Sequence, residues 1–266
     1  MISEWQNKWA LVSGASAGIG VALAEELAAG GTHLLLTARR LDRLEKLAAD
    51  LRKKYEIQTQ VFAADLAKRE APEKIFEHTK EEGLRIDLLI NNAGFGQYGE
   101  LHKVEKQRLV DMVEVNCTAV VHLTRLFLPD MVARRAGDIL IVASTAAFQA
   151  VPYISTYAAS KAFDLYFAEG LAEEMKPHGI RVCALCPGST ESEFHTVAGQ
   201  EKFTAKHQEP ADKVARTGLQ ALVAGKSYVI SGLGNYLGAH SQRVVPRRVV
   251  TRIAAKMFRP DKAGKN

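Results

Sequence analysis

Short apolar runs alternate with helical segments along almost the whole chain, and this alternation constrains the fold more than any other feature. The apolar runs lie at residues 9–13, 33–37, 58–63, 86–91, 138–144, 180–185 and 227–231. Most of them are apolar at nearly every position, as strands are when both faces of a sheet are covered. We therefore predict an α/β fold with a doubly wound, seven-stranded parallel sheet flanked by helices on both faces.

The segments between the predicted strands carry apolar residues at helical spacing. They span residues 19–29, 41–55, 72–82, 104–132, 155–176 and 211–224. No repeat and no Gly/Ser/Pro-rich linker interrupts them, which predicts a single Rossmann-type domain over residues 1–240. Within it, residues 188–210 form a long connection after the sixth strand, where such folds bind ligands. Residues 246–258 are predicted to form a helix within a separate basic tail, 241–266.

The positive charge of the chain is concentrated in that tail. The sequence has 35 Lys and Arg against 30 Asp and Glu, a formal net charge of +5. Residues 241–266 hold eight basic residues and one acidic residue, so residues 1–240 have a net charge of −2. An acidic body without a recognised nucleic-acid module argues against nucleic-acid binding. The helix predicted in the tail could bind an anionic membrane surface. Alternatively, it could pack over the core with its apolar side and leave its arginines in solvent. We expect the docked helix and no membrane partner.

Three cysteines, Cys117, Cys183 and Cys186, are too few and odd in number for a disulfide framework, which favours a reducing, cytoplasmic location. Cys183 and Cys186 fall on opposite faces of a predicted strand, so we interpret them as core residues and predict no metal site. Residues 1–8 are polar, and we expect no signal peptide. The uncharged run 139–160 contains several polar residues and a proline, so we expect no membrane span there.

A glycine-rich loop joins the first predicted strand to the first predicted helix. Gly14, Gly18 and Gly20 have the spacing G-x-x-x-G-x-G. Such a loop lets a diphosphate approach a helix N-terminus, where unpaired N–H groups attract anions, although a plain tight turn has the same pattern. The second strand ends at Arg39 and Arg40, with no acidic residue to accept the ribose hydroxyl of NAD. We therefore favour NADP(H), with solvated surface arginines as the alternative.

Tyr157 and Lys161 are four residues apart and lie on one face of a predicted helix. The pKa of free tyrosine, near 10, is too high for acid–base work at neutral pH. An ammonium about 4 Å away stabilises the phenolate by roughly 4 kcal/mol at an effective dielectric constant of 20. This would bring the pKa toward neutrality, although desolvation opposes it. The spacing alone also fits a surface pair, but Ser144 ends a predicted strand and can face the same crevice.

Together these motifs resemble those of the short-chain dehydrogenase/reductase family. The resemblance runs in order over roughly residues 9–235. Its motifs are the glycine loop, Asp65, Asn91-Asn92-Ala93-Gly94, Asn116, Ser144, Tyr157, Lys161, Pro187-Gly188 and Thr190. Ser13 stands where the family most often has threonine, and the hydroxyl is kept.

The resemblance implies an NADP(H)-dependent oxidoreductase that interconverts an alcohol and a carbonyl on a small-molecule substrate, and that forms a homodimer or homotetramer. Tyr157 would be the general acid/base, Ser144 would polarise the carbonyl, Lys161 would lower the tyrosine pKa, and Asn116 would support a proton relay. The cofactor would contact Gly14, Ser16, Gly18, Ile19, Gly20, Arg39, Asp65, Asn92, Ala93, Gly94, Tyr157, Lys161, Pro187, Gly188 and Thr190. The alternative is a dinucleotide-binding regulatory or membrane-associated protein that uses the basic C-terminal helix.

Overall fold

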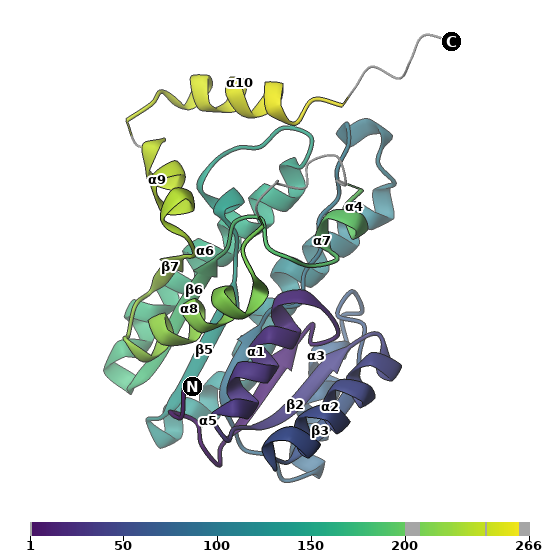
Figure 1. The fold of residues 1–266 in the computed structure, drawn as a ribbon, viewed down its shortest axis with the longest axis vertical. Helices are drawn as coiled ribbons and strands as arrows, with labels where there is room; N and C mark the ends of the chain where they lie inside the picture. The colour runs from purple at the N-terminus through teal and green to yellow at the C-terminus, as the bar shows by residue number, and fades with distance from the viewer. Residues whose placement is uncertain (1, 200–207, 243, 261–266) are drawn as a thin grey trace.

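The computed structural model of the chain describes residues 2–199, 208–242 and 244–260 (Figure 1). Its seven strands form one parallel sheet in the order β3-β2-β1-β4-β5-β6-β7. They are β1 (Trp9–Ser13), β2 (His33–Ala38), β3 (Thr59–Ala63), β4 (Ile86–Asn91), β5 (Gly137–Val142), β6 (Ile180–Cys186) and β7 (Tyr228–Ile230). The strand order reverses between β1 and β4, and doubly wound sheets bind ligands at the carboxyl ends of the strands beside such a reversal. The predicted fold class is confirmed.

Helices cover both faces of the sheet. One face carries α1 (Gly18–Ala29), α2 (Leu41–Tyr55) and α8 (Ala211–Val223). The other carries α3 (Ala71–Glu81), α5 (Ala119–Arg134) and α6 (Ser155–Met175). Side chains of a strand point alternately to the two faces, so Leu34 and Leu36 enter the first core while Leu35 enters the second. The near-continuous apolar strands of the sequence are thus explained by burial on both sides.

The long helical stretch predicted over residues 104–132 is confirmed, but it is not a regular α-helix throughout. The structure has α4 (Lys106–Val113), a π-helical turn η2 (Glu114–Thr118) and then α5 without a break. The turn lies in the middle of the predicted segment, and an apolar period alone does not reveal the extra residue that a π turn accommodates. Such turns are frequent at functional sites, and this one carries Asn116.

The fifth strand also ends earlier than predicted, at Val142. Ser144 instead precedes the short helix η3 (Thr145–Phe148), and its hydroxyl accepts a hydrogen bond from the Ala146 N–H at 3.1 Å. Capping of a helix N-terminus by serine ends the strand locally.

The remaining short helices are η1 (Leu101–Lys103), η4 (Lys176–His178), α7 (Phe194–Val197), α9 (Leu233–Ser241) and α10 (Arg247–Met257). α10 lies across one end of the molecule, apart from the sheet and its two helix layers (Figure 1). The boundary predicted at residue 240 falls inside α9. Parts of the predicted loop 188–210 and of the tail 241–266 lie outside the described residues. Within the described ranges, no helix has both the length and the hydropathy needed to cross a membrane.

Candidate active site

The glycine loop brings the end of β1 close to the start of α1. Gly14 and Gly18 have positive φ angles of 68° and 55°, which side chains other than glycine rarely adopt. A methyl group added to Gly20 would lie 2.3 Å from the Gly14 carbonyl oxygen. The N-cap residue of α1, Ala17, provides no side-chain cap, and the first turn has no acidic residue. The first N–H groups and the helix dipole are therefore available to an anion.

Ser13 fastens this loop to the end of β4. Its hydroxyl donates to the Ile90 carbonyl oxygen at 3.1 Å and accepts from the N–H groups of Asn92 and Ala93, both at 3.0 Å. The Asn92 amide donates back to the Ser13 carbonyl oxygen at 2.8 Å. The two strand ends beside the topological reversal are thus held as one unit. The sequence identified Ser13 only as a departure from a family pattern and missed this role.

The end of β2 presents two arginines with different surroundings. Arg39 is exposed and has no ion pair with another described residue. Arg40 donates to the Ser16 hydroxyl at 3.2 Å and pairs with Glu193 at 2.8 Å, and Arg43 pairs with the same carboxylate at 2.7 Å. Hydrogen bonds from Arg43 and Arg40 lower the pKa of Glu193. A cluster of positive charge therefore lies beside the glycine loop, and the carboxylate of Glu193, from the connection 188–210, is bound to it.

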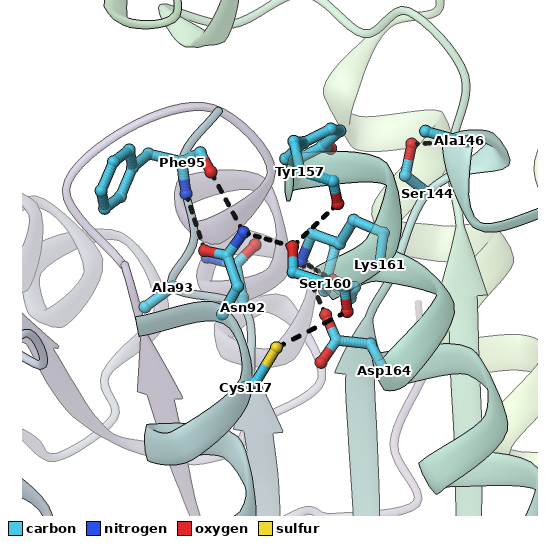
Figure 2. Close-up of polar contacts among 12 residues, drawn as sticks. Asn92, Ala93, Phe95, Cys117, Ser144, Ala146, Tyr157, Ser160, Lys161 and Asp164 are labelled. Atoms are coloured by element: carbon cyan, nitrogen blue, oxygen red, sulfur yellow. Dashed lines mark hydrogen bonds and ion pairs between the residues drawn. The ribbon is translucent and has the colours of Figure 1, made fainter. Parts of the chain in front are cut away.

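The four predicted catalytic residues come from three elements. Tyr157 and Lys161 lie on α6 and Ser144 precedes η3 (Figure 2). Asn116 lies on η2. Ser144 and Tyr157 lie within hydrogen-bond reach of each other, and this hydrogen bond acts to lower the Tyr157 pKa against the stronger effect of burial. Four residues separated by up to 45 positions in the sequence are assembled here in one region.

Asn116 is held by a local hydrogen-bond network. Its amide exchanges two hydrogen bonds with the Phe95 backbone, both 3.1 Å, and donates to the Ser160 hydroxyl at 2.9 Å. A methyl group on Gly94 would lie 3.2 Å from Asn116 Oδ1 and 3.4 Å from Lys161 Nζ, so both side chains reach the same glycine. The structure therefore brings Asn116 near Lys161, and it adds Ser160, which the sequence reasoning missed.

Lys161 makes a buried ion pair that the sequence reasoning also missed. Its ammonium donates to the Val142 carbonyl oxygen at 2.7 Å. It also donates to Asp164 Oδ2 at 2.9 Å (Figure 2). The two side chains are only 6% and 1% exposed. Burial raises the pKa of Asp164, against the attraction of Lys161. Burial alone would lower the pKa of Lys161, but Asp164 and Tyr157 outweigh it and raise that pKa.

The expected lowering of the Tyr157 pKa is wrong in direction. Burial raises this pKa above 10, and the positive charge of Lys161 and the hydrogen bond of Ser144 only partly offset it. The Asp164 carboxylate raises it further. The expectation failed because it counted the ammonium but not the carboxylate that neutralises it, and because it gave desolvation too little weight.

An apolar cluster surrounds the Tyr157 ring. The Phe194 ring centroid lies 5.1 Å from that of Tyr157. The other members are Met112, Val151, Ile154, Ala158 and Ala254, with the partly buried Phe95, Tyr98, Leu109, Ala146 and Phe258. The Tyr98 hydroxyl also donates to the Phe258 carbonyl oxygen at 2.9 Å. Residues of α7 and of the C-terminal segment therefore form part of the wall around the reactive hydroxyl.

The other predicted cofactor contacts lie at the carboxyl ends of strands. Asp65 follows β3 and accepts from the Ala67 N–H at 3.2 Å. After β6, the Pro187 carbonyl oxygen accepts from the Thr145 N–H at 2.9 Å, and the buried Thr190 donates to the Gly188 carbonyl oxygen. Ile19 is half-buried at the start of α1. These residues share the edge of the sheet with the glycine loop, which is compatible with contact to a single extended ligand.

Cys183 and Cys186 are core residues, as the sequence indicated, whereas Cys117 is only partly buried. Cys183 packs in the core on one face of the sheet and Cys186 in the core on the other. Burial raises the pKa of Cys183 to about 12 and that of Cys117 to about 11. The described part of the chain holds no group of three or more His, Cys, Asp or Glu residues able to bind a metal ion.

Comparison with known proteins agrees with this geometry. Residues 8–202 match the family model described as short chain dehydrogenase. The chain is 38% identical to very-long-chain 3-oxoacyl-CoA reductase of Phaeosphaeria nodorum and 37% identical to that of Anas platyrhynchos. These alignments cover 66% and 67% of this chain but only 53% and 58% of the relatives, so the chain spans little more than half their length.

A short-chain dehydrogenase from Sphingobium yanoikuyae, solved in complex with NADPH, superposes with a TM-score of 0.82 at 28% identity. The superposition covers 97% of this chain and 99% of that one.

Proposed function

The chain belongs to the short-chain dehydrogenase family, and from that premise we propose that it is an NADP(H)-dependent oxidoreductase that reduces a carbonyl group on a largely apolar substrate. The observation that carries the proposal is the assembly of Asn116, Ser144, Tyr157 and Lys161 beside the reversal point of the sheet. A protein that only sensed a dinucleotide would not require all four.

The residues at the reversal point fit a dinucleotide. The uncapped N-terminus of α1 and the close approach at Gly20 suit a diphosphate. Arg40 and Ser16, with Arg39 next to them, offer donors to a 2′-phosphate. The end of β2 carries no acidic residue to accept a 2′-hydroxyl; the nearby Glu193 is paired with Arg40 and Arg43. The Sphingobium structure in complex with NADPH supports NADP(H).

When bound, the dinucleotide supplies the hydride. Tyr157 then donates the proton to the substrate oxygen, and its raised pKa keeps it protonated at neutral pH, as reduction requires. Ser144 donates a hydrogen bond to the same oxygen and polarises the carbonyl. Lys161, anchored by Asp164 and the Val142 carbonyl oxygen, stabilises the negative charge that develops on the phenol as the proton leaves.

The surroundings of Tyr157 favour an apolar substrate. The cluster around its ring is almost entirely apolar. A cavity of about 350 Å³ shares Leu109 with this cluster, and its lining is mixed, with Leu101 and Val104 beside polar residues such as Gln97 and Glu100. Burial of a ligand's apolar surface against the cluster itself gives roughly 25 cal/mol per Å². The fungal and avian relatives suggest 3-oxoacyl thioesters as the first substrate class to test.

We also propose that the chain works in a reducing, cytoplasmic compartment as a homodimer or homotetramer. The exposed Phe163 and Tyr166 on α6 and Val121 on α5 support association through these helices. Sedimentation of the full chain tests the oligomer.

The activity is tested by following NADPH and NADH oxidation with a 3-oxoacyl thioester, a bulky apolar ketone and a small polar ketone. We expect turnover with NADPH and preference for the apolar carbonyls. Tyr157→Phe should lower kcat by roughly 10²–10⁴-fold, the usual contribution of general acid catalysis. Oxidation of neither cofactor, or a Tyr157→Phe variant as active as the parent, would overturn the proposal.

A further inference from the structure

α10 carries an apolar stripe that is left largely exposed. Val249, Ile253 and Met257 repeat every four residues, and they are 42%, 53% and 65% exposed. Residues four apart lie on one face of a helix. The helix is attached through a different face, where Ala254 is buried in the apolar cluster around Tyr157. The expectation of a docked helix is therefore right about the docking, with Ala254 and Phe258 against the cluster, but part of the apolar side stays exposed.

A basic stripe runs beside the apolar one. Arg248, Arg252 and Lys256 each precede a member of the apolar stripe by one position, and all three are exposed. None of them forms an ion pair with a described residue, and residues 242–260 contain no Asp or Glu. The positive charge of the chain thus collects on one exposed helix at one end of the molecule (Figure 1).

We propose that α10 docks the protein on an anionic lipid surface. Helices that lie in the membrane interface combine an apolar face with flanking Lys and Arg, and here the two stripes adjoin each other. Each Lys or Arg held near an anionic leaflet strengthens binding by about fivefold. The side chains of the apolar stripe can enter the lipid while the basic stripe meets the headgroups.

A second copy of the chain fits this surface less well. Stable interfaces bury about 800 Å² per partner, far more than three partly exposed side chains provide. In a two-fold symmetric pair the same patch faces itself, so the basic stripes would be brought together and would repel each other.

Docking through α10 places the proposed active site beside the membrane; this step rests on the proposed function. Ala254 and Phe258 belong to the apolar cluster around Tyr157, so the wall of the site is continuous with the lipid-facing helix. A water-insoluble carbonyl compound dissolved in the membrane would then reach the site from the lipid side.

The test uses the full chain without substrate or turnover, so its outcome is independent of the proposed activity. Cosedimentation is measured with vesicles of phosphatidylcholine alone and of phosphatidylcholine with phosphatidylserine, at low and high salt. The variant R248Q/R252Q/K256Q removes the basic stripe. Its matched control, K46Q/K53Q/K226Q, removes three exposed charges from other parts of the chain. A third variant, I253Q/M257Q, weakens the apolar stripe.

We expect the parent and the control to bind vesicles that contain phosphatidylserine and not phosphatidylcholine alone. R248Q/R252Q/K256Q should bind roughly a hundredfold more weakly, and I253Q/M257Q should lose the binding that persists at high salt. All variants should melt like the parent, because the changed side chains are exposed. The proposal is overturned if the parent does not bind, if the basic-stripe variant binds like its control, or if I253Q/M257Q only dissociates an oligomer.

Discussion

Asp164→Asn removes the negative charge from the buried ion pair that holds Lys161. The Asp164 and Lys161 charges lie 2.9 Å apart, which at an effective dielectric constant of 20 corresponds to an attraction of about 6 kcal/mol. Desolvation offsets part of this, and removing one partner of a buried pair typically costs about 3–5 kcal/mol of folding free energy. For a chain of this size, that corresponds to a fall in melting temperature of roughly 6–20 °C.

The double variant Lys161→Met/Asp164→Asn shows whether the lost stability comes from the unpaired charge or from the changed shape of the side chain. It leaves no buried charge unpaired, so most of the lost stability should return, although activity is lost with Lys161. Calorimetry of the parent, both single variants and the double variant measures the coupling. Equal melting temperatures for Asp164→Asn and the parent, or a double variant no more stable than Asp164→Asn, would refute the reasoning.

Asp164→Asn should also change how stability and kcat/KM depend on pH. The pKa of Lys161 is raised above its ordinary 10.5, so the lysine charge contributes its full stabilisation below pH 10.5, as long as Asp164, whose pKa burial raises, is ionised. This contribution is lost as the pH rises through the folded-state pKa. Asp164 also raises the pKa of Tyr157. Without its charge that pKa falls, and the alkaline limb of kcat/KM for carbonyl reduction should move to lower pH. An unchanged limb in an active Asp164→Asn variant would contradict this electrostatic role.

Three further predictions concern other parts of the chain. Glu193→Gln should leave stability nearly unchanged, because its ion pairs are exposed, but should tighten NADPH binding by roughly two- to fivefold as two arginines are freed; weaker binding by calorimetric titration would refute this. Gly20→Ala should abolish measurable NADPH binding and lower stability by about 1–3 kcal/mol, because the new methyl group meets the Gly14 carbonyl oxygen at 2.3 Å; denaturant titration measures the loss. The buried Cys183 and Cys186 should resist a thiol reagent at neutral pH until the protein unfolds, since burial raises both pKa values; labelling before unfolding would contradict their assignment to the core.

Much of the site could be predicted from the sequence because its motifs are local. The spacing of Tyr157 and Lys161 places them on one helix face, and glycines between a strand and a helix mark a turn that admits an anion. The order of the strand ends then brings Asn92 and Ser144 to the same edge of the sheet. Asp164 escaped notice although it lies only three residues after Lys161, because a charged residue on a helix is usually solvated and burial cannot be read from spacing.

The sequence by itself determined the sheet, the alternation of strands and helices and the identity of the reactive side chains, because these depend on periodicity and on neighbours along the chain. Only the tertiary structure decided how those side chains are charged and covered. It neutralises Lys161 with Asp164, reverses the expected direction of the Tyr157 pKa, and joins Glu193 to Arg40 across 153 residues. It also leaves the apolar stripe of α10 facing outward. Periodicity shows which face of a helix is apolar, but what covers that face depends on contacts between segments far apart in the chain.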